Sequence, residues 1–373
     1  MRVLLIARYR DATMWRKVTW LAQERDLQVR LLLPRYWQDP LLTVNQANVT
    51  LPFDHGSLAM VGRPDDPHRA LYRTVAFGLL RYRPDIIHAE EEPDSLAALQ
   101  IVAARALFAP RARLILHTWQ NVDRPKRWYV RATQRLTTGA AAAIFCANRA
   151  AAELLHAAGY QGPTPVVPAI GVDTTTFTPC APAPPAKPFV IGFVGRLVPE
   201  KGVDLLLRAV ARLCEDQAGQ IPVRLLIIGD GPERTHLQEL ATSLGISDRT
   251  EFLPAIPPRE VAKVLCQFST LVLPSRTTAV WQEQLGRVLL EAMATGIPVV
   301  GSDSGAIPEV IGDAGLIFPE DDVEQLAACL HSLARDAALR SRLSALGLQR
   351  AQNQYSQQVL AVRTAAIYRQ VIT

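Results

Sequence analysis

Short apolar runs alternate with longer segments of helical period along the whole 373-residue sequence. The runs are rich in Val, Ile and Leu with little alternation, which is typical of strands buried on both faces. Such strands, separated by helices, predict parallel α/β sheets. The predicted strands are Val3–Ala7, Val29–Leu33, Asp85–His88, Leu114–His117, Ala141–Cys146, Phe189–Val194, Val223–Ile228, Thr250–Leu253, Thr270–Leu273 and Pro298–Gly301.

The same pattern occurs once in each half of the chain. A chain of this length exceeds one ordinary hydrophobic core, so two domains of about 150–200 residues each are expected. Between the halves lies TPCAPAPPAKP (178–188), a proline-dense stretch that can continue neither a helix nor a sheet ladder. We therefore expect a first domain over 1–178, a linker over 179–188 and a second domain over 189–354.

Composition and charge indicate the kind of environment. The chain is 49% apolar and 20% charged, as in soluble globular proteins. No apolar run approaches the ~20 residues of a bilayer span, and the first run is too short for a signal peptide. The five cysteines lack metal-ligand spacing, which predicts reduced thiols in a cytoplasmic protein. Residues 1–180 carry 22 Lys and Arg against 15 Asp and Glu, which favours an anionic partner for that half.

The most informative segment is 274–301. A helix is predicted to begin near Gly286 and to end at Gly296. Its N-terminus presents free N–H groups and the positive end of the helix dipole, which suit a phosphate. Glu283 precedes this helix and Glu291 lies within it, so their carboxylates can accept hydrogen bonds from hydroxyls on either side of that phosphate. The alternative is that both glutamates are ordinary charges at a helix start and on a helix surface.

Two other loops join a predicted strand to a predicted helix. GRLVPEKG (195–202) places Arg196 and Lys201 at the carboxyl edge of a parallel sheet, where open α/β sheets bind ligands. A guanidinium fork and a point charge there suit a diphosphate, although Lys and Arg are also common in solvated loops. Gly229 and Gly231 permit close approach of a nucleotide, and a plain strand-to-helix connection explains them equally well.

Together these segments resemble the family 4 retaining glycosyltransferases of the GT-B fold (glycosyl transferases group 1). The matching motifs occur in the family's order and are densest over residues 188–320. They are PDIIHAEEEP (84–93), IGVDTTTFTP (170–179), GRLVPEKG (195–202), LLIIGDGP (225–232), EFLPAIP (251–257), and the E-x7-E pair of Glu283 and Glu291 followed by EAMATGIPVVGSDSGAIPEVI (291–311).

The resemblance implies an α/β protein of two Rossmann-like domains whose parallel sheets face one another across a cleft. The first domain would serve the acceptor, with the C-terminal helix over 355–373 packing back on it, and the second would hold the nucleotide-sugar donor. The implied activity is retaining, metal-independent hexosyl transfer to a glycan or lipid-linked acceptor, as in polysaccharide biosynthesis. No cofactor and no nucleic-acid partner are implied.

The resemblance also implies roles for individual residues. Arg196 and Lys201 would neutralise the donor diphosphate, Glu283 would bind hydroxyls of the donor sugar, and Glu291 would bind the ribose. Backbone groups beside the nucleotide and its phosphates would come from Gly195, Gly229, Gly231, Leu285, Gly286, Arg287 and Val288.

The first half departs from the family pattern. The family has a glycine-rich loop after its first strand, whereas residues 7–12 here contain no glycine. The family's active-site histidine aligns with Gln120, and His117 stands three residues earlier, so either can serve as the acceptor-side or sugar-side group. Glu92, in the strand-plus-acid segment, is a third candidate.

A basic cluster suggests contact with an anionic membrane, which would place the protein peripherally on the inner membrane face. Arg124, Lys126, Arg127, Arg131 and Arg135 are interleaved with Trp128 and Tyr129. Like charges at i,i+4 on a helix repel, so an anionic partner would relieve that repulsion, and a solvated helix face is the alternative.

Two other functions remain open. A sugar-nucleotide 2-epimerase has the same architecture, and a degenerate transferase would bind nucleotide without catalysis.

Overall fold

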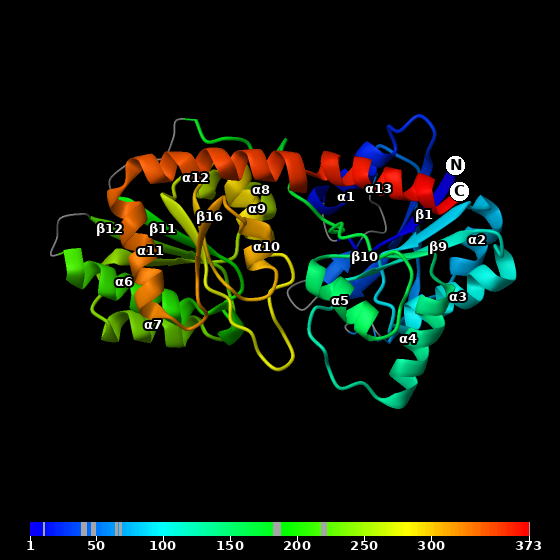
Figure 1. Ribbon diagram of the computed structural model, residues 1–373, viewed down its shortest axis with the longest axis horizontal. Coiled ribbons are helices and arrows are strands. Elements are labelled where there is room, and N and C mark those ends of the chain that lie inside the picture. The colour runs from blue at the N-terminus through cyan, green and yellow to red at the C-terminus, as the bar shows by residue number, and fades with distance from the viewer. Residues whose placement is uncertain are drawn as a thin grey trace. The chain divides into compact units, whose positions relative to one another are not determined.

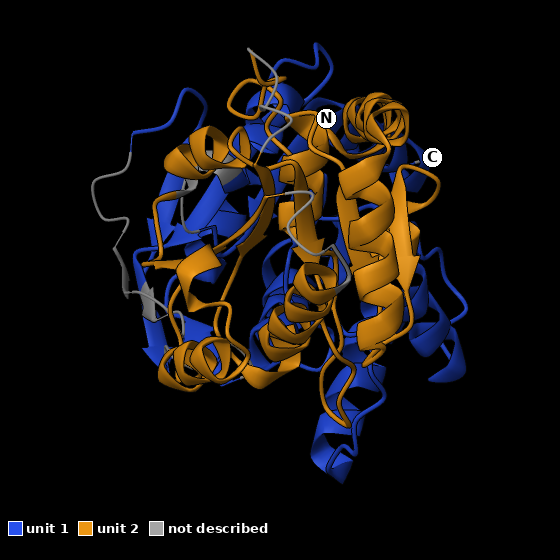
Figure 2. Ribbon diagram, turned by 90° about the vertical axis from the view of Figure 1, so that its left-hand side faces the viewer, with its two compact units in different colours: residues 1–171, 357–373 blue, residues 172–356 orange. Residues whose placement is uncertain are grey.

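The computed structural model describes residues 1–9, 12–38, 43–45, 50–63, 66, 69–181, 188–217 and 222–372. It divides into two compact units, one made of residues 1–171 with 357–373 and the other of residues 172–356 (Figure 2). Each unit contains a six-stranded parallel sheet flanked by helices (Figure 1). Most of the predicted linker, over 182–187, lies outside the described residues.

The sheet of the first unit has the strand order β10-β9-β8-β1-β2-β5. Two short antiparallel hairpins, β3-β4 and β6-β7, accompany it. The elements are β1 (Arg2–Ile6), α1 (Ala12–Leu21), β2 (Gln28–Pro34), β3 (Tyr36–Gln38), β4 (Thr43–Asn45), β5 (His55–Leu58), β6 (Met60–Gly62), β7 (Ala70–Tyr72), α2 (Val75–Tyr82), β8 (Ile86–Ala89), α3 (Leu96–Phe108), β9 (Arg113–Thr118), α4 (Trp128–Ala140), β10 (Ala143–Cys146), α5 (Arg149–Ala157) and α13 (Gln357–Ile372).

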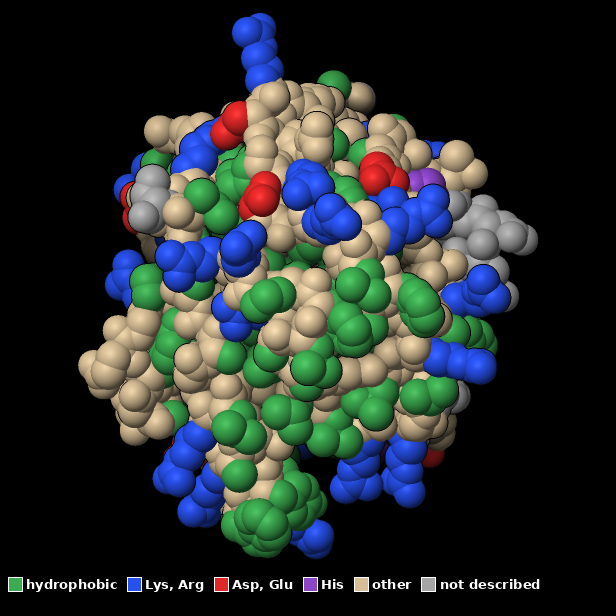
Figure 3. Space-filling model, turned by 90° about the vertical axis from the view of Figure 1, so that its right-hand side faces the viewer, with side chains coloured by type: hydrophobic (Ala, Val, Ile, Leu, Met, Phe, Trp, Pro, Cys, Tyr) green, Lys and Arg blue, Asp and Glu red, His purple; other side chains and the backbone are tan. Residues whose placement is uncertain are grey.

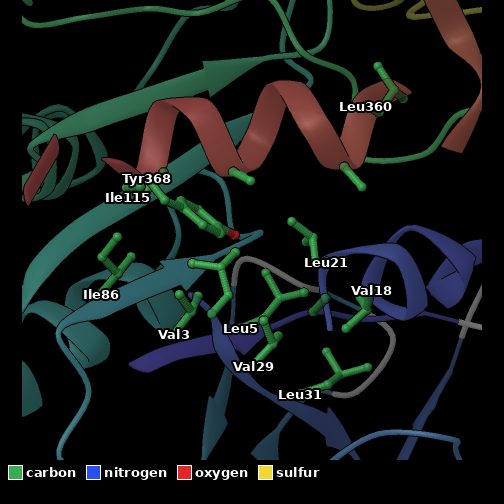
Figure 4. Packing of buried hydrophobic residues seen from close by; sticks show 14 of the residues in the cluster. Val3, Leu5, Val18, Leu21, Val29, Leu31, Ile86, Ile115, Leu360 and Tyr368 are labelled. Atoms are coloured by element: carbon green, nitrogen blue, oxygen red, sulfur yellow. The ribbon is translucent and has the colours of Figure 1, made fainter. Parts of the chain in front are cut away.

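Strand β1 is buried because its side chains alternate between two cores. Val3 and Leu5 pack with the buried side chains of α1 and α13, and Leu4 packs in the cluster that includes α2 and α3. Figure 4 shows the first of these clusters, with Leu21 of α1 and Tyr368 of α13 lying over the strands. This double burial explains why the strand sequences show so little period-two alternation.

The last helix, α13, belongs to the first unit although almost two hundred residues separate it from the rest of that unit. It packs against α1, and Leu360 and Tyr368 are fully buried. The Tyr368 hydroxyl lies 2.7 Å from Nδ1 of His88, which satisfies one polar atom of each buried ring.

The sheet of the second unit has the order β13-β12-β11-β14-β15-β16. Its elements are β11 (Phe189–Val194), a 3-10 turn (Pro199–Lys201), α6 (Val203–Gln217), β12 (Val223–Ile228), α7 (Arg234–Ser243), a second 3-10 turn (Ser247–Arg249), β13 (Thr250–Leu253), α8 (Pro258–Leu265), β14 (Thr270–Leu273), α9 (Arg287–Ala294), β15 (Val299–Ser302), α10 (Ile307–Ile311), β16 (Gly315–Phe318), α11 (Val323–Arg335), α12 (Ala337–Arg350) and a π-helical turn (Ala351–Tyr355).

Each of the ten predicted strands is present, with boundaries shifted by at most two residues. The prediction lacks β5 and β16, which are edge strands of the two sheets. Both are four residues long and bury only their last side chain fully, so they lack the continuous apolar run that identifies the central strands.

The expectation that all five cysteines are reduced thiols is wrong for two of them. Cys180 and Cys266 form a disulfide, at a sequence separation of 86. Cys146, Cys214 and Cys329 are free. The pairing depends on the fold bringing residue 180 beside the C-terminal end of α8, and no local spacing in the sequence announces it.

Within the described ranges, no helix is both long and apolar enough to cross a bilayer.

Candidate active site

The candidate donor residues lie where the strands of the second unit end. The loop after β11 carries Gly195, Arg196 and Lys201, and the loop after β12 carries Gly229 and Gly231. The loop between β14 and α9 carries Glu283. Because these strands are neighbours in a parallel sheet, their loops meet at its carboxyl edge.

The loops after β11 and β12 pack closely because residues 229 and 231 are glycines and have no side chain. A Cβ at Gly229 would lie 1.8 Å from the carbonyl oxygen of Gly195, and one at Gly231 would lie 2.2 Å from that of Leu197. The amide of Leu197 donates to the carbonyl of Asp230 at 3.0 Å. The glycines therefore allow the loop after β12 to pack directly on the loop after β11. The expected approach of a nucleotide to them stays a prediction.

Lys201 and Glu283, 82 residues apart in sequence, form an ion pair. Nζ of Lys201 donates to Oε2 of Glu283 at 2.6 Å, and the hydroxyl of Ser275 donates to the same oxygen at 2.8 Å. Glu283 is 7% exposed, and the Lys201 ammonium lies over the Trp281 ring, 4.9 Å from its centroid. The sequence indicates the cation and the carboxylate but gives no sign of Ser275 and Trp281.

The backbone around Glu283 is held from a third loop. The amide of Ala306 donates to the carbonyl oxygen of Glu283 at 2.9 Å. Gly305 has a φ of 53°, and a Cβ there would lie 2.2 Å from that same oxygen. The loop after β15 can approach Glu283 this closely because residue 305 is glycine.

Arg276 connects the loop after β14 to the segment that begins α6 and to the residue before Lys201. Its guanidinium binds both carboxylate oxygens of Asp204, at 2.6 and 2.9 Å, and also binds Asp321. Its amide donates to the carbonyl of Glu200 at 2.8 Å. The residue before Lys201 is thus tied to the loop that leads to Glu283, a link that the sequence does not reveal.

Helix α9 begins at the residue that the sequence predicts. Gly286 is the N-cap in the left-handed conformation, with a φ of 68°, and it provides no side-chain cap. The first amides of α9 therefore donate no hydrogen bond to an N-cap side chain, which suits an anion. Leu285 is buried, and Arg287 and Val288 form the first turn.

Glu291 lies one turn into α9 and is 7% exposed. Nε of Arg287 donates to its Oε1 at 2.9 Å. The carboxylate is thus buried and charge-paired, unlike the solvated helix-surface glutamate of the alternative interpretation.

Arg196 differs from the other cations of the site. It is half-buried, and its guanidinium has no ion pair or hydrogen bond to any residue that the structure describes. A half-buried guanidinium without a carboxylate partner favours an incoming anion.

In the first unit, Glu92 and Gln120 lie at the carboxyl ends of β8 and β9. Glu92 accepts hydrogen bonds from the Thr118 hydroxyl and the Trp119 amide, both at 2.7 Å. Oε1 of Gln120 accepts from Lys126 at 2.9 Å, and Gln120 lines a pocket of about 570 Å³. These two candidates therefore lie on neighbouring strand ends.

His117 has a different environment from Gln120. It is 1% exposed, it stacks on His88 with 6.5 Å between ring centroids, and neither ring nitrogen has a hydrogen-bond partner among the described residues. Burial, with a smaller contribution from Lys17, lowers the pKa of His117 well below its ordinary value. Gln120 and His117 are the two candidates for the position of the family's active-site histidine. Of these two residues, only Gln120 lines the pocket.

The described part of the chain contains no group of three His, Cys, Asp or Glu side chains that could hold a metal ion. Of the loop after β1, residues 10 and 11 lie outside the described residues.

These observations define a doubly wound α/β protein whose second unit gathers cations, buried carboxylates and a helix N-terminus at one sheet edge. Residues 178–350 match the model of the family "Glycosyl transferases group 1", and residues 12–169 match that of the "Glycosyl transferase 4-like domain". The chain belongs to this glycosyl transferase group 1 family, with a GT-B fold, as the resemblance in the sequence predicts.

Individual relatives extend the comparison. The chain is 36% identical over 173 residues to D-inositol 3-phosphate glycosyltransferase of Nocardia farcinica, which covers 44% of this chain and 36% of that protein. It is 31% identical over 210 residues to the GDP-mannose-dependent monoacylated alpha-(1-6)-phosphatidylinositol monomannoside mannosyltransferase of Corynebacterium glutamicum, which covers 53% and 54%. The matched part thus spans between about a third and just over half of these relatives.

The fold comparison covers more of the chain. The crystal structure of HepE from Anabaena in complex with UDP matches with a TM-score of 0.75 at 18% identity. The match covers 99% of this chain and all of that one. At this identity the likeness establishes the fold alone.

Proposed function

We propose that this protein transfers a sugar from a nucleotide-sugar donor to an acceptor with retention of anomeric configuration. The observation that carries the proposal is the carboxyl edge of the second unit, where the Lys201–Glu283 ion pair, the N-terminus of α9 and Arg196, which pairs with no described residue, belong to neighbouring loops. A diphosphate that leaves a sugar gains negative charge, and this edge supplies positive groups from the loop after β11 and from the start of α9.

Arg196 and Lys201 hold the departing diphosphate in this proposal. The bond between the anomeric carbon and the phosphate oxygen breaks, and its electron pair stays on the diphosphate. Lys201 is already oriented by Glu283, whose carboxylate also accepts a hydrogen bond from Ser275, so little reorganisation is needed when charge develops. Glu283 accepts hydrogen bonds from hydroxyls of the donor sugar, and Glu291 accepts from the ribose.

No metal takes part in this proposed reaction. The two cations and the first amides of α9 supply the charge stabilisation that a divalent ion provides elsewhere. The retained configuration is implied by the family resemblance.

The donor we propose is a UDP- or GDP-hexose. HepE was crystallised with UDP, and the name of the Corynebacterium relative specifies GDP-mannose. The HepE ligand supports a nucleoside diphosphate, and the name of the Corynebacterium relative supports a nucleoside diphosphate that carries a hexose.

The acceptor we propose binds the pocket beside Gln120 in the first unit. Three arginines that line it, Arg124, Arg131 and Arg135, have no ion pair among the described residues. A phosphate-bearing glycan or lipid-linked glycan therefore suits it, and both relatives named above have inositol phosphate groups in their names.

Thermal unfolding with UDP, GDP and ADP tests the donor part of the proposal. A ligand at about a hundredfold excess over its Kd stabilises the folded state by about 2.7 kcal/mol, so one nucleoside diphosphate should raise the Tm. The Arg196→Ala variant should lose this increase. An equal, small change in Tm with all three nucleotides, in both the unaltered protein and Arg196→Ala, would contradict the proposal. That result would favour a protein that does not bind nucleotide-sugar donors.

A further inference from the structure

Three neighbouring helices of the first unit expose large apolar side chains. α3 packs against both α2 and α4, so the three form one surface. Phe77, Leu107 and Trp128, one from each helix, are 72%, 75% and 80% exposed. The other exposed apolar side chains on these helices are Leu80, Leu96, Phe108, Tyr129 and Leu136.

The exposure of these side chains does not result from poor packing of the helices. α2 buries Val75 and Leu79 against the sheet, and it turns Phe77 and Leu80 outward. α4 buries Thr133 and Thr137, which are polar, and exposes Trp128 and Leu136. α4 thus buries two threonines and exposes large apolar side chains beside Arg131 and Arg135, which indicates that something other than water covers the outer face.

The charged side chains within these three helices all have the same sign. The sequences of α2, α3 and α4 contain no Asp or Glu, whereas they contain Arg81, Arg105, Arg131 and Arg135. Arg111 and Arg127 lie immediately beside α3 and α4 and are exposed. Figure 3 shows the corresponding side of the molecule, with hydrophobic side chains gathered across its middle, and with Lys and Arg side chains and a few Asp and Glu side chains along its margins.

The basic cluster predicted from the sequence is divided in the structure. Lys126 pairs with Asp94 at 2.9 Å and donates to Gln120 and Gln134, so it serves the pocket. Arg127 is exposed and makes no ion pair with a described residue. The surface therefore depends on arginines that the protein itself does not neutralise.

We propose that the outer face of α2, α3 and α4 docks on an anionic lipid bilayer. Trp and Tyr favour the lipid–water interface, the apolar side chains enter the acyl boundary, and Arg81, Arg111 and Arg127, which do not line the acceptor pocket, bind lipid phosphates. A second copy of this chain is a poor occupant, because a symmetric contact would place arginines against arginines with no acid on the face to pair them. The inference does not depend on donor chemistry.

The test is sedimentation of the full chain with vesicles. One set contains phosphatidylcholine alone, and the other contains equal parts of phosphatidylcholine and phosphatidylglycerol. We expect binding to the anionic set that weakens with added salt, and little binding to the neutral set. The Phe77→Gln/Leu107→Gln/Trp128→Gln variant should lose about tenfold in partitioning per side chain. Arg81→Gln/Arg127→Gln should lose about fivefold per arginine.

The matched control is Val362→Gln/Ile317→Gln, which removes apolar side chains that are 54% and 40% exposed elsewhere. It should bind anionic vesicles like the unaltered protein. The proposal is overturned if the unaltered protein does not distinguish the two vesicle sets or if the triple variant binds as tightly as the control. It is also overturned if gel filtration shows a dimer that the triple variant abolishes. Unchanged Tm values in all variants establish that the differences do not arise from unfolding.

Discussion

At the scale of single residues, Lys201 and Glu291 are both charged and both paired with an oppositely charged side chain. Their proposed positions along the donor differ. Lys201 faces the charge that grows as the sugar–phosphate bond breaks, whereas Glu291 holds the ribose, which does not react. Interactions made more strongly in the transition state change kcat, and uniform binding interactions change KM.

Replacing Lys201 with Ala should therefore lower kcat by about 10²–10³-fold. Glu291→Ala should raise the donor KM more than Lys201→Ala does. Steady-state kinetics on both variants measures this, with Lys263→Ala, an exposed lysine on α8, as the control. Near-normal kcat in Lys201→Ala would remove this residue from the mechanism.

His117 provides a second prediction at this scale. Burial lowers the pKa of His117 and of its neighbour His88 below that of the unfolded chain, which is about 6.5. The unfolded state then binds more protons at acidic pH, so this stability is complete above about pH 6.5 and is lost as the pH falls towards the folded pKa. The loss is at most about 1.4 kcal/mol per pH unit for each histidine.

His117→Leu should reduce this pH dependence, because leucine does not titrate and the buried ring nitrogens have no described partner to lose. Urea unfolding at about pH 7.5 and about pH 5.5 compares the two proteins. The exposed His236→Gln is the control. If His117→Leu loses as much stability on acidification as the parent, the buried histidine does not cause the effect.

The three consecutive glutamates 90–92 show how far residue-level prediction reaches. Only Glu92 is a candidate from the sequence, and the structure gives the other two different partners: Glu90 bonds the buried Lys17 and Tyr9, and Glu91 bonds Arg8 and Tyr72. Glu92 alone lies between the ends of β8 and β9, bonded to Thr118 and Trp119. Partners from distant segments decide these roles, so a pattern of neighbours could not assign them.

At the scale of elements, the donor-side loops depend on close backbone contacts. Gly305 and Gly245 both adopt positive φ, 53° and 69°, so alanine at either position is strained. They differ in their surroundings. A Cβ at residue 305 would meet the Glu283 carbonyl oxygen, whereas a Cβ at residue 245 would meet nothing within 4 Å.

Gly305→Ala should therefore displace the Glu283 loop and lower kcat by at least about tenfold, since a misplaced catalytic group costs up to 10²-fold. Gly245→Ala should lose less stability, through backbone strain alone, and keep its activity. Kinetics and thermal unfolding of both variants separate the two effects. Equal activity in the two variants would show that the contact with Glu283 does not position the site.

Element-scale prediction succeeds for the buried strands and for α9. The apolar runs of the central strands and the Gly286–Gly296 frame of α9 are local signals. No local signal in the sequence predicts the edge strands β5 and β16 or the ion pairs of Arg276. Short half-exposed strands and ion pairs between loops depend on tertiary contacts.

At the scale of the whole molecule, the chain comprises two α/β units, each with its own parallel sheet and its own set of candidate residues. The donor candidates belong to the second unit, and Gln120, Glu92 and the pocket belong to the first. The repetition of the α/β pattern predicts this organisation. The Cys180–Cys266 disulfide was missed because its partners are distant in sequence, and only the assembled second unit brings them together.

The most direct test of sugar transfer is NMR of the reaction with α-linked UDP- and GDP-hexoses in the presence of EDTA, using a phosphorylated glycan acceptor. We predict release of the nucleoside diphosphate together with a product whose new glycosidic bond is α, at a rate that EDTA leaves unchanged and that Lys201→Ala lowers. An inverted product, or activity that EDTA abolishes and Mg²⁺ restores, would contradict the account of how this site works. Conversion of the donor to its epimer, with no sugar transferred, would show that the protein acts as an isomerase and not as a transferase.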